Sequence, residues 1–301
     1  MKIFEGIIPV VNTPFNDDGS IDFESQRRLV RFLLDCGAHG LALFGNASEG
    51  YTLTGYERAE LMKVIISEVN GRVPVIVSTG HTGTDAAVSL SREAEAAGAD
   101  GVMVLPPYLL RPDAEGLFEY YRAISDSIKI PVQIQDAPLM TQVVMGAPLI
   151  ARMGRELEMV QYAKIEAPPT APKVSEVLVL AGNSLTVLGG LNGHFLIEEL
   201  NRGARGTMPG SDLADVFVRI WNLYEEGRVR EARDEFNRHL PLIRFELQPG
   251  LGVSVMKQNL KVGGVIASTR VRHPTKSIDE EGSRELEELR RELDLLALRW
   301  R

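Results

Sequence analysis

The amino-acid sequence predicts an α/β fold, a (β/α)8 TIM barrel with a C-terminal helical extension, from three observations. Eight short apolar runs alternate with amphipathic stretches, no second regime of composition interrupts them, and only helical patterns follow about residue 211. Alternation of strands and helices is typical of a parallel sheet, and eight such units favour closure into a barrel. We therefore expect a barrel with the active site at residues 1–228 and a helical extension at residues 229–301.

The eight predicted strands are apolar with little polar alternation, as expected for strands that are buried on both faces. No GxGxxG pattern follows the first of them, so an open dinucleotide-binding sheet has little support. The strands are predicted at residues 6–12, 40–45, 73–79, 101–106, 130–136, 159–166, 185–190 and 204–210.

Helical patterns fill the intervals between the strands and the end of the chain. Those at residues 25–37, 57–71 and 85–98 each end on a glycine, which is a common stop signal for a helix. Four more follow the eighth strand. The first is expected to close the barrel and the other three to form the extension, with the last helix packed on the barrel. These four are predicted at residues 216–227, 228–247, 252–264 and 284–300.

Composition limits the classes of partner. The 301 residues carry a formal net charge of −8 without a basic stripe, so we expect no nucleic-acid partner. No apolar run approaches the roughly 20 residues of a membrane span, and the first residues are interpreted as a strand rather than a signal peptide. Cys36 is the only cysteine and lies at a predicted helix end, so we expect a packed thiol and a reducing cytoplasm.

Active sites of such barrels collect at the carboxyl ends of the strands, and Lys164 is the unusual residue there. It lies within the apolar run VQYAKIE, where loss of solvation lowers the pKa of a lysine and favours the neutral amine that imine formation needs. A lysine paired with a carboxylate such as Glu166 is the alternative. Lys129 and Lys173 resemble solvated surface charges.

The loop GNASEG (45–50) after the second strand is the second candidate. Its small residues let backbone N–H groups point into the barrel mouth, and with the Ser48 hydroxyl such a nest suits a carboxylate. An ordinary turn with a capping serine is the alternative. His81 could titrate near the site or be a loop histidine bonded to backbone, and Tyr108 could help proton transfer or pack at the rim. Asn192 and His194 are as suited to capping a helix as to touching substrate.

In this order and spacing, these segments resemble the dihydrodipicolinate synthase / N-acetylneuraminate lyase family over residues 3–300. GNASEG stands where that family has G-T-T-G-E, residues 130–138 (IPVQIQDAP) replace its Y-N-V-P segment, and YAKIEA corresponds to G-I-K-E-A. The resemblance implies a class I lyase that forms an imine between Lys164 and a small 2-oxo acid. It also implies a homotetramer, with neither a cofactor nor a metal.

Departures from the family pattern affect the expected activity. Asn46 and Ala47 replace the two loop threonines, Gln135 replaces the strand-five tyrosine, Leu109 the tyrosine from a neighbouring subunit and Met140 an arginine. Dihydrodipicolinate synthesis is therefore not expected. The segments IQDAP, YAKIEAP, GGVIASTRVRHP and LALRW resemble a subgroup of sugar-acid dehydratases of the 2-keto-3-deoxy-L-arabonate type.

The predicted reaction is therefore dehydration of a 2-keto-3-deoxy sugar acid, with retro-aldol cleavage of C3–C4 as the alternative from the same imine. A non-catalytic binder would be expected to lose Lys164, and a metal-dependent lyase would need a ligand cluster that the sequence does not show. The predicted catalytic residues are Lys164, Gln135 and Tyr108. The predicted substrate-binding residues are Asn46, Ala47, Ser48, His81, Gly190 and Met208.

Overall fold

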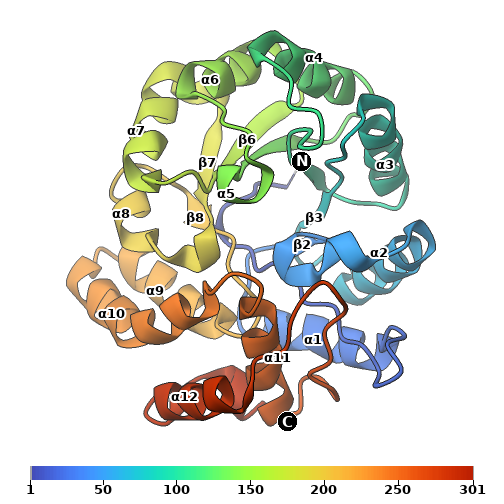
Figure 1. Ribbon diagram of the computed structural model, residues 1–301. Helices are drawn as coiled ribbons and strands as arrows, with labels where there is room; N and C mark the ends of the chain where they lie inside the picture. The colour runs from blue at the N-terminus through green and yellow to red at the C-terminus, as the bar shows by residue number, and fades with distance from the viewer. Residues whose placement is uncertain (1, 301) are drawn as a thin grey trace. The chain divides into compact units, whose positions relative to one another are not determined.

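A computed structural model describes residues 2–300 of the chain, and each predicted apolar run contains one strand (Figure 1). Each strand is shorter than its run, because the flanking residues belong to the loops. The strands are β1 (Gly6–Ile7), β2 (Leu41–Leu43), β3 (Val75–Ser78), β4 (Gly101–Val104), β5 (Val132–Asp136), β6 (Val160–Ile165), β7 (Thr186–Gly189) and β8 (Gly206–Thr207).

The chain divides into two compact units, and the first comprises residues 1–5, 74–191 and 195–208. Its strands β3 to β8 neighbour one another in chain order, and the registers of β3 to β8 are parallel. Helices lie along the outside of these strands in Figure 1, as right-handed strand–helix connections require. They are α3 (Thr84–Ala96), α4 (Ala114–Ser125), α6 (Ala147–Glu156), α7 (Thr170–Ala181) and α8 (Leu196–Leu200), with a short α5 (Pro138–Thr141).

A register shift between β5 and β6 decides which residues are neighbours at the carboxyl ends of these strands. Val132 pairs with Val160, but the next residue, Gln133, pairs with Tyr162, so β6 contains one extra residue. Beyond this irregularity Gln135 lies beside Lys164, which in turn lies beside Leu188 of β7. An uninterrupted register would have placed Ala163 there instead.

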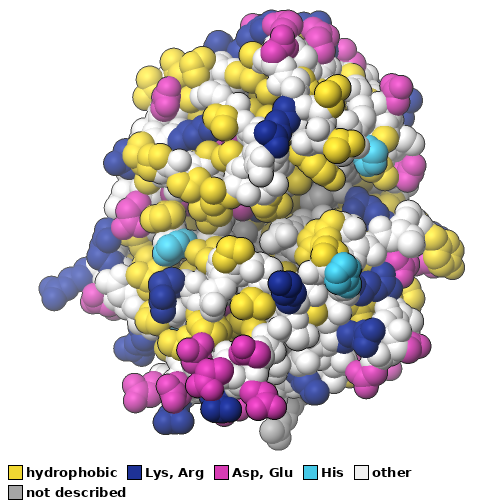
Figure 2. All heavy atoms as spheres, viewed as in Figure 1, with side chains coloured by type: hydrophobic (Ala, Val, Ile, Leu, Met, Phe, Trp, Pro, Cys, Tyr) yellow, Lys and Arg dark blue, Asp and Glu magenta, His cyan; other side chains and the backbone are white. Residues whose placement is uncertain are grey.

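The second unit comprises residues 6–73, 192–194 and 209–301. Its helix starts follow local chemistry: Asp22 caps α1 by accepting from the Ser25 N–H, and Thr54 and Glu57 form a reciprocal capping box on α2. The unit contains β1, β2, α1 (Phe23–Asp35), α2 (Gly55–Val69), α9 (Ala214–Glu225), α10 (Val229–Glu246), α11 (Gly252–Val262) and α12 (Glu280–Arg290). In Figure 2, Lys, Arg, Asp and Glu side chains gather at the position of α12.

The prediction of one last helix over residues 284–300 is wrong, since α12 ends at Arg290. Long-range hydrogen bonds hold residues 291–300 in a non-helical conformation or in short turns. The Leu296 N–H donates to Asp215 of α9 at 3.1 Å, and the Trp300 indole N–H donates to Asp35 of α1 at 2.9 Å. A regular helix through residue 300 would forfeit both bonds, so packing overrides the helical propensity of this leucine-rich segment.

Two other expectations can be compared with the structure. Cys36 is buried, and burial raises the pKa of its thiol, as expected of a packed side chain. Within residues 2–300, no helix combines the length and apolarity that crossing a bilayer requires. The division at residue 228 stays a prediction.

Candidate active site

Lys164 lies near the carboxyl end of β6 with a side chain that is 5% exposed. Its Nζ atom is 3.2 Å from Oε1 of Glu166, so the carboxylate pairing that was the alternative for this lysine is present. Pairing and imine chemistry do not exclude each other, because a carboxylate beside an ammonium can accept the proton whose loss frees the amine. The pair is therefore a chemically competent unit.

Glu166 was not among the predicted site residues, yet it has the most polar contacts in this region. Its Oε2 accepts from the Gln135 amide at 2.8 Å, and its Oε1 accepts from the backbone N–H of Leu191 at 3.0 Å as well as pairing with Lys164. Burial raises the pKa of Glu166, but Lys164, Gln135 and the Leu191 N–H together outweigh it, so the pKa lies below its ordinary value. Glu166 is therefore an ionised carboxylate.

The position of Glu166 in the sequence held a usable signal. Residues two apart in a strand point to the same face, so a carboxylate two places after an inward-facing lysine falls beside it. Gly190 then makes room, because a Cβ at that position would overlap the side chain of Glu166. This packing accounts for the glycine by itself, and its predicted contact with substrate stays a prediction.

The other predicted residues of this unit fall into two groups. Gln135 and Met208 are buried, Gln135 against Glu166 and Met208 directly after β8. Tyr108 is 48% exposed on the loop before α4. The His81 side chain is exposed and its Nδ1 accepts the N–H of Gly83 at 3.2 Å, which is the backbone-bonded arrangement considered as its alternative. Only Gln135 thus contacts the Lys164–Glu166 pair directly.

Lys173 corrects another prediction, because it is not a solvated surface charge. Its Nζ lies 2.6 Å from Asp136 Oδ2 and donates to the carbonyl of Met145 at 2.7 Å, and its side chain is 14% exposed. The first turn of α7 brings this lysine to the end of β5, a long-range placement that the local sequence pattern does not encode. Lys129 is exposed as predicted.

In the second unit, the loop 45–50 is held from behind by polar side chains. Asn12 donates to the carbonyl of Ala47 at 2.8 Å and Thr13 to the carbonyl of Ser48 at 2.7 Å. Asn46 is exposed, whereas the Ser48 hydroxyl is buried and has no hydrogen-bond partner among residues 2–300. A buried hydroxyl without a partner is costly, so Ser48 is suited to receive a polar ligand.

The same loop is fixed by a second buried lysine–glutamate pair. Glu49 has a left-handed backbone (φ 53°) and pairs with Lys257 of α11, and both side chains are fully buried. Lys257 also donates to the carbonyl of Arg270 at 2.8 Å, and Glu49 accepts the Arg272 N–H at 2.8 Å. Burial lowers the pKa of Lys257 to about 8 against the opposing effect of Glu49. The helical extension thus anchors the predicted carboxylate-binding loop.

Asn192 takes the structural role that was one of its alternatives. Its amide donates to Glu246 of α10 at 2.6 Å, and its oxygen accepts the Gly210 N–H at 2.8 Å. These bonds tie the turn after β7 to α10 and to the turn after β8. His194 in the same turn is half-buried.

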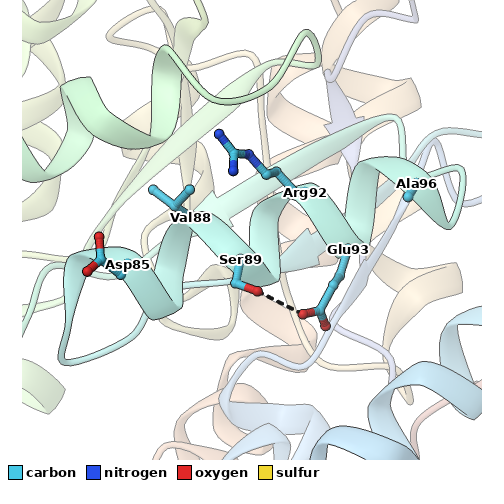
Figure 3. Close-up of a pocket in the computed structure, with 6 residues that line it drawn as sticks. All are labelled: Asp85, Val88, Ser89, Arg92, Glu93 and Ala96. Carbon is cyan, nitrogen blue, oxygen red and sulfur yellow. Dashed lines mark hydrogen bonds between the residues drawn. The ribbon is translucent and has the colours of Figure 1, made fainter.

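Neither a metal centre nor a surface hollow along α3 adds to this site. Residues 2–300 contain no group of three or more His, Cys, Asp or Glu side chains placed to hold a metal ion. A hollow lies along α3, where Ser89 donates to Glu93 at 3.0 Å (Figure 3). It is lined by one helix alone and contains none of the predicted site residues; its lining residues are Asp85, Val88, Ser89, Arg92, Glu93 and Ala96.

Comparison with known proteins gives the site a context. The model of the dihydrodipicolinate synthetase family matches residues 3–293. An L-2-keto-3-deoxyarabonate dehydratase of Azospirillum brasilense is 40% identical over 300 residues, which cover 98% of this chain and 96% of that protein. A 4-hydroxy-tetrahydrodipicolinate synthase of Pelobacter propionicus is 34% identical over 247 residues, which cover 81% of this chain and 82% of that protein.

Solved structures agree on the fold. Dihydrodipicolinate synthase from Rhodopseudomonas palustris superposes with a TM-score of 0.91 at 32% identity, covering 97% of this chain and 100% of that one. The enzyme of the same name from Thermotoga maritima gives a TM-score of 0.90 at 27% identity, covering 96% and 98%. The predicted (β/α)8 fold with C-terminal helices is confirmed.

Proposed function

Because the chain belongs to the dihydrodipicolinate synthetase family, we propose that it dehydrates a 2-keto-3-deoxy sugar acid through an imine at Lys164. The family and the dehydratase relative indicate a lyase. The observation that carries the finer proposal is the buried row of Gln135, Lys164 and Glu166, in which an amine and an ionised carboxylate lie 3.2 Å apart.

In the first step Glu166 accepts a proton from the Lys164 ammonium, and the neutral amine attacks the C2 ketone. Glu166 then returns this proton to the C2 oxygen, which leaves as water, so that the protonated imine forms and Glu166 is ionised again. Pairing with the carboxylate makes this proton transfer short, and burial of both side chains excludes competing water.

In the second step the imine withdraws electrons from C3, and Glu166 removes a C3 proton to give the enamine. The enamine expels the C4 hydroxyl, which leaves as water with a proton returned by Glu166. Hydrolysis of the conjugated imine frees Lys164 and the product. Gln135 has no useful pKa of its own, so its role is to orient Glu166 through the 2.8 Å bond.

The substrate carboxylate is assigned to the loop 45–50. The donor is the Ser48 hydroxyl, which has no hydrogen-bond partner among residues 2–300. If the contact is equal in ground and transition states, Ser48→Ala should raise KM more than it lowers kcat. An unchanged KM in this variant would remove the loop from the proposal and leave the imine in place.

Retro-aldol cleavage is the second candidate, since it passes through the same imine and would release pyruvate. The 40% identical dehydratase favours water loss. Synthases are among the relatives, but synthase activity is not proposed for this chain. The family resemblance implies that the synthase reaction needs a tyrosine and an arginine, and Gln135 and Met140 stand in their places. Condensation of pyruvate with aspartate semialdehyde should be negligible.

The experiment is to incubate the enzyme with a panel of 2-keto-3-deoxy acids and to score pyruvate against dehydrated oxo-acid product. Water loss from at least one acid without pyruvate is the expected result. Pyruvate as the main product would replace the dehydratase with an aldolase. Failure of borohydride to trap an adduct on Lys164 would overturn both.

Assembly into a homotetramer is also proposed. Besides the family resemblance, an apolar surface in the first unit supports self-association, since monomers rarely expose such patches. Hydrophobic side chains gather over α5 in Figure 2, and Arg111 bonds to Gln142 at 2.6 Å between the two loops that carry them. The exposed side chains are Tyr108, Leu109, Leu110, Leu139, Met140 and Val144. Sedimentation of the purified chain tests the proposal.

A further inference from the structure

Two consecutive glycines at the end of β7 each adjoin a buried carboxylate. A Cβ at Gly190 would overlap Glu166, and a Cβ at Gly189 would overlap Oε2 of Glu199 from α8. Successive positions of an extended chain point to opposite faces, so the two carboxylates lie on opposite faces of the same strand end. Because glycine has no side chain, both carboxylates can lie directly against the backbone of the strand end.

Glu199 itself is fully buried and incompletely paired. Its Oε1 accepts the Thr170 hydroxyl at 2.6 Å, whereas its Oε2 has no hydrogen-bond partner among residues 2–300. The Thr207 hydroxyl, also without a partner there, lies 3.3 Å from the same Cβ position at Gly189. An ionised carboxylate with an oxygen that receives no donor is costly in such a place, so the neutral acid is favoured.

The charges that act on Glu199 are negative. Burial raises the pKa of Glu199 to about 7, although the hydrogen bond from the Thr170 hydroxyl lowers it. The negative charges of Glu166 and Glu198 raise it a little further. The neighbouring α7 and β8 contribute the hydroxyls of Thr170 and Thr207, which carry no charge. On the side of Glu166, Lys164 is already paired with that carboxylate.

We infer that Glu199 is a positioning residue whose carboxyl group, acting across the glycine pair, sets how readily Glu166 takes up a proton. The inference rests on the proposed role of Glu166 in proton transfer. Neutral Glu199 leaves Glu166 a weak base that stays ionised beside Lys164. Ionised Glu199 repels that negative charge and makes Glu166 a stronger base toward the C3 proton. Glu199 exchanges its own proton with solvent and makes no bond to substrate.

The test uses pyruvate as the probe, because exchange of its C3 hydrogens for deuterium needs only the imine and the base. The exchange rate of the unaltered enzyme should show an inflection near pH 7, with the rate rising roughly 3- to 10-fold across it. Glu199→Gln keeps an oxygen that accepts from Thr170 but cannot ionise, so this inflection should vanish. A profile identical to that of the unaltered enzyme would overturn the inference.

Thr170→Val is the matched second variant and decides the question if Glu199→Gln does not fold. It keeps the carboxyl group but removes the donor that favours its ionised form, so the inflection should move to higher pH. An inflection that stays in place would contradict the role of Glu199. Borohydride trapping of pyruvate on Lys164 is measured in parallel. No adduct and no exchange in the unaltered enzyme would count against the proposed function instead.

Discussion

Residues 2–300 contain two buried lysine–glutamate pairs, and their surroundings differ. Lys257 and Glu49 are fully buried, and each has a further backbone partner, in Arg270 and Arg272. Lys164 and Glu166 lie at a strand end beside a glycine, where Nζ and Oε1 are 3.2 Å apart. A lysine with several fixed partners serves the fold, whereas one paired with a single carboxylate can exchange its proton and react.

Of the substitutions that compare the two pairs, Lys164→Ala should have the largest effect on activity. Without the amine no imine forms, so turnover should fall by about 10⁴-fold or more, the scale seen when a covalent catalytic group is removed. The remaining bonds of Glu166 to Gln135 and Leu191 should keep the fold intact. Circular dichroism and product assay check both statements, and an active variant would refute the imine at this position.

Glu166→Gln should come next in size. Loss of the group that moves protons should lower kcat by about 10²- to 10⁴-fold. Borohydride should still trap pyruvate on Lys164, but more slowly, because Glu166 also takes the lysine proton in the first step. Mass spectrometry of the peptide that carries Lys164 measures the adduct. Full activity of this variant would assign proton transfer to another residue.

Lys257→Met should affect stability more than chemistry. It leaves Glu49 buried without its cation, which typically costs about 3–5 kcal/mol of unfolding free energy. The exposed Lys261 on the same helix is the matched control, and Lys261→Met should change stability by less than about 0.5 kcal/mol. Chemical denaturation measures both variants. If the Lys257 and Lys261 variants were equally stable, the structural role given to the Lys257–Glu49 pair would be wrong.

The smallest effect should be on the stability of the protein in acid, and it concerns Glu57, which lies near the Lys257–Glu49 pair. The Arg272 guanidinium lowers the pKa of Glu57 to about 2 from an ordinary 4.5. A lowered carboxyl pKa contributes stability that is present above pH 4.5 and lost as the pH falls toward 2. Glu57→Gln should therefore flatten the loss of stability over this range, as thermal melts at several pH values would show. An unchanged slope would mean that other carboxylates dominate.

Local patterns predicted much of this molecule. The eight apolar runs each hold a strand because buried parallel strands need apolar residues on both faces. Lys164 was identifiable because a charge inside such a run is unusual. Glu166 was named only as a possible partner of Lys164, although its place two residues later was visible in the sequence. Lys173 and Lys257 were misread or missed because their partners lie far away along the chain. Long-range contacts of this kind leave no periodic trace.

The ordered tail has a practical consequence for handling the protein. Residues 291–300 return to the second unit, where Trp300 bonds to Asp35 and packs edge-on against Phe32, and Ala297 is fully buried. Truncation after Arg290 would uncover an aromatic face of α1 and remove the backbone donor on Asp215. Shortened versions made for crystallisation should therefore stop no earlier than residue 300, and an affinity tag placed at this end needs a linker that leaves the indole seated.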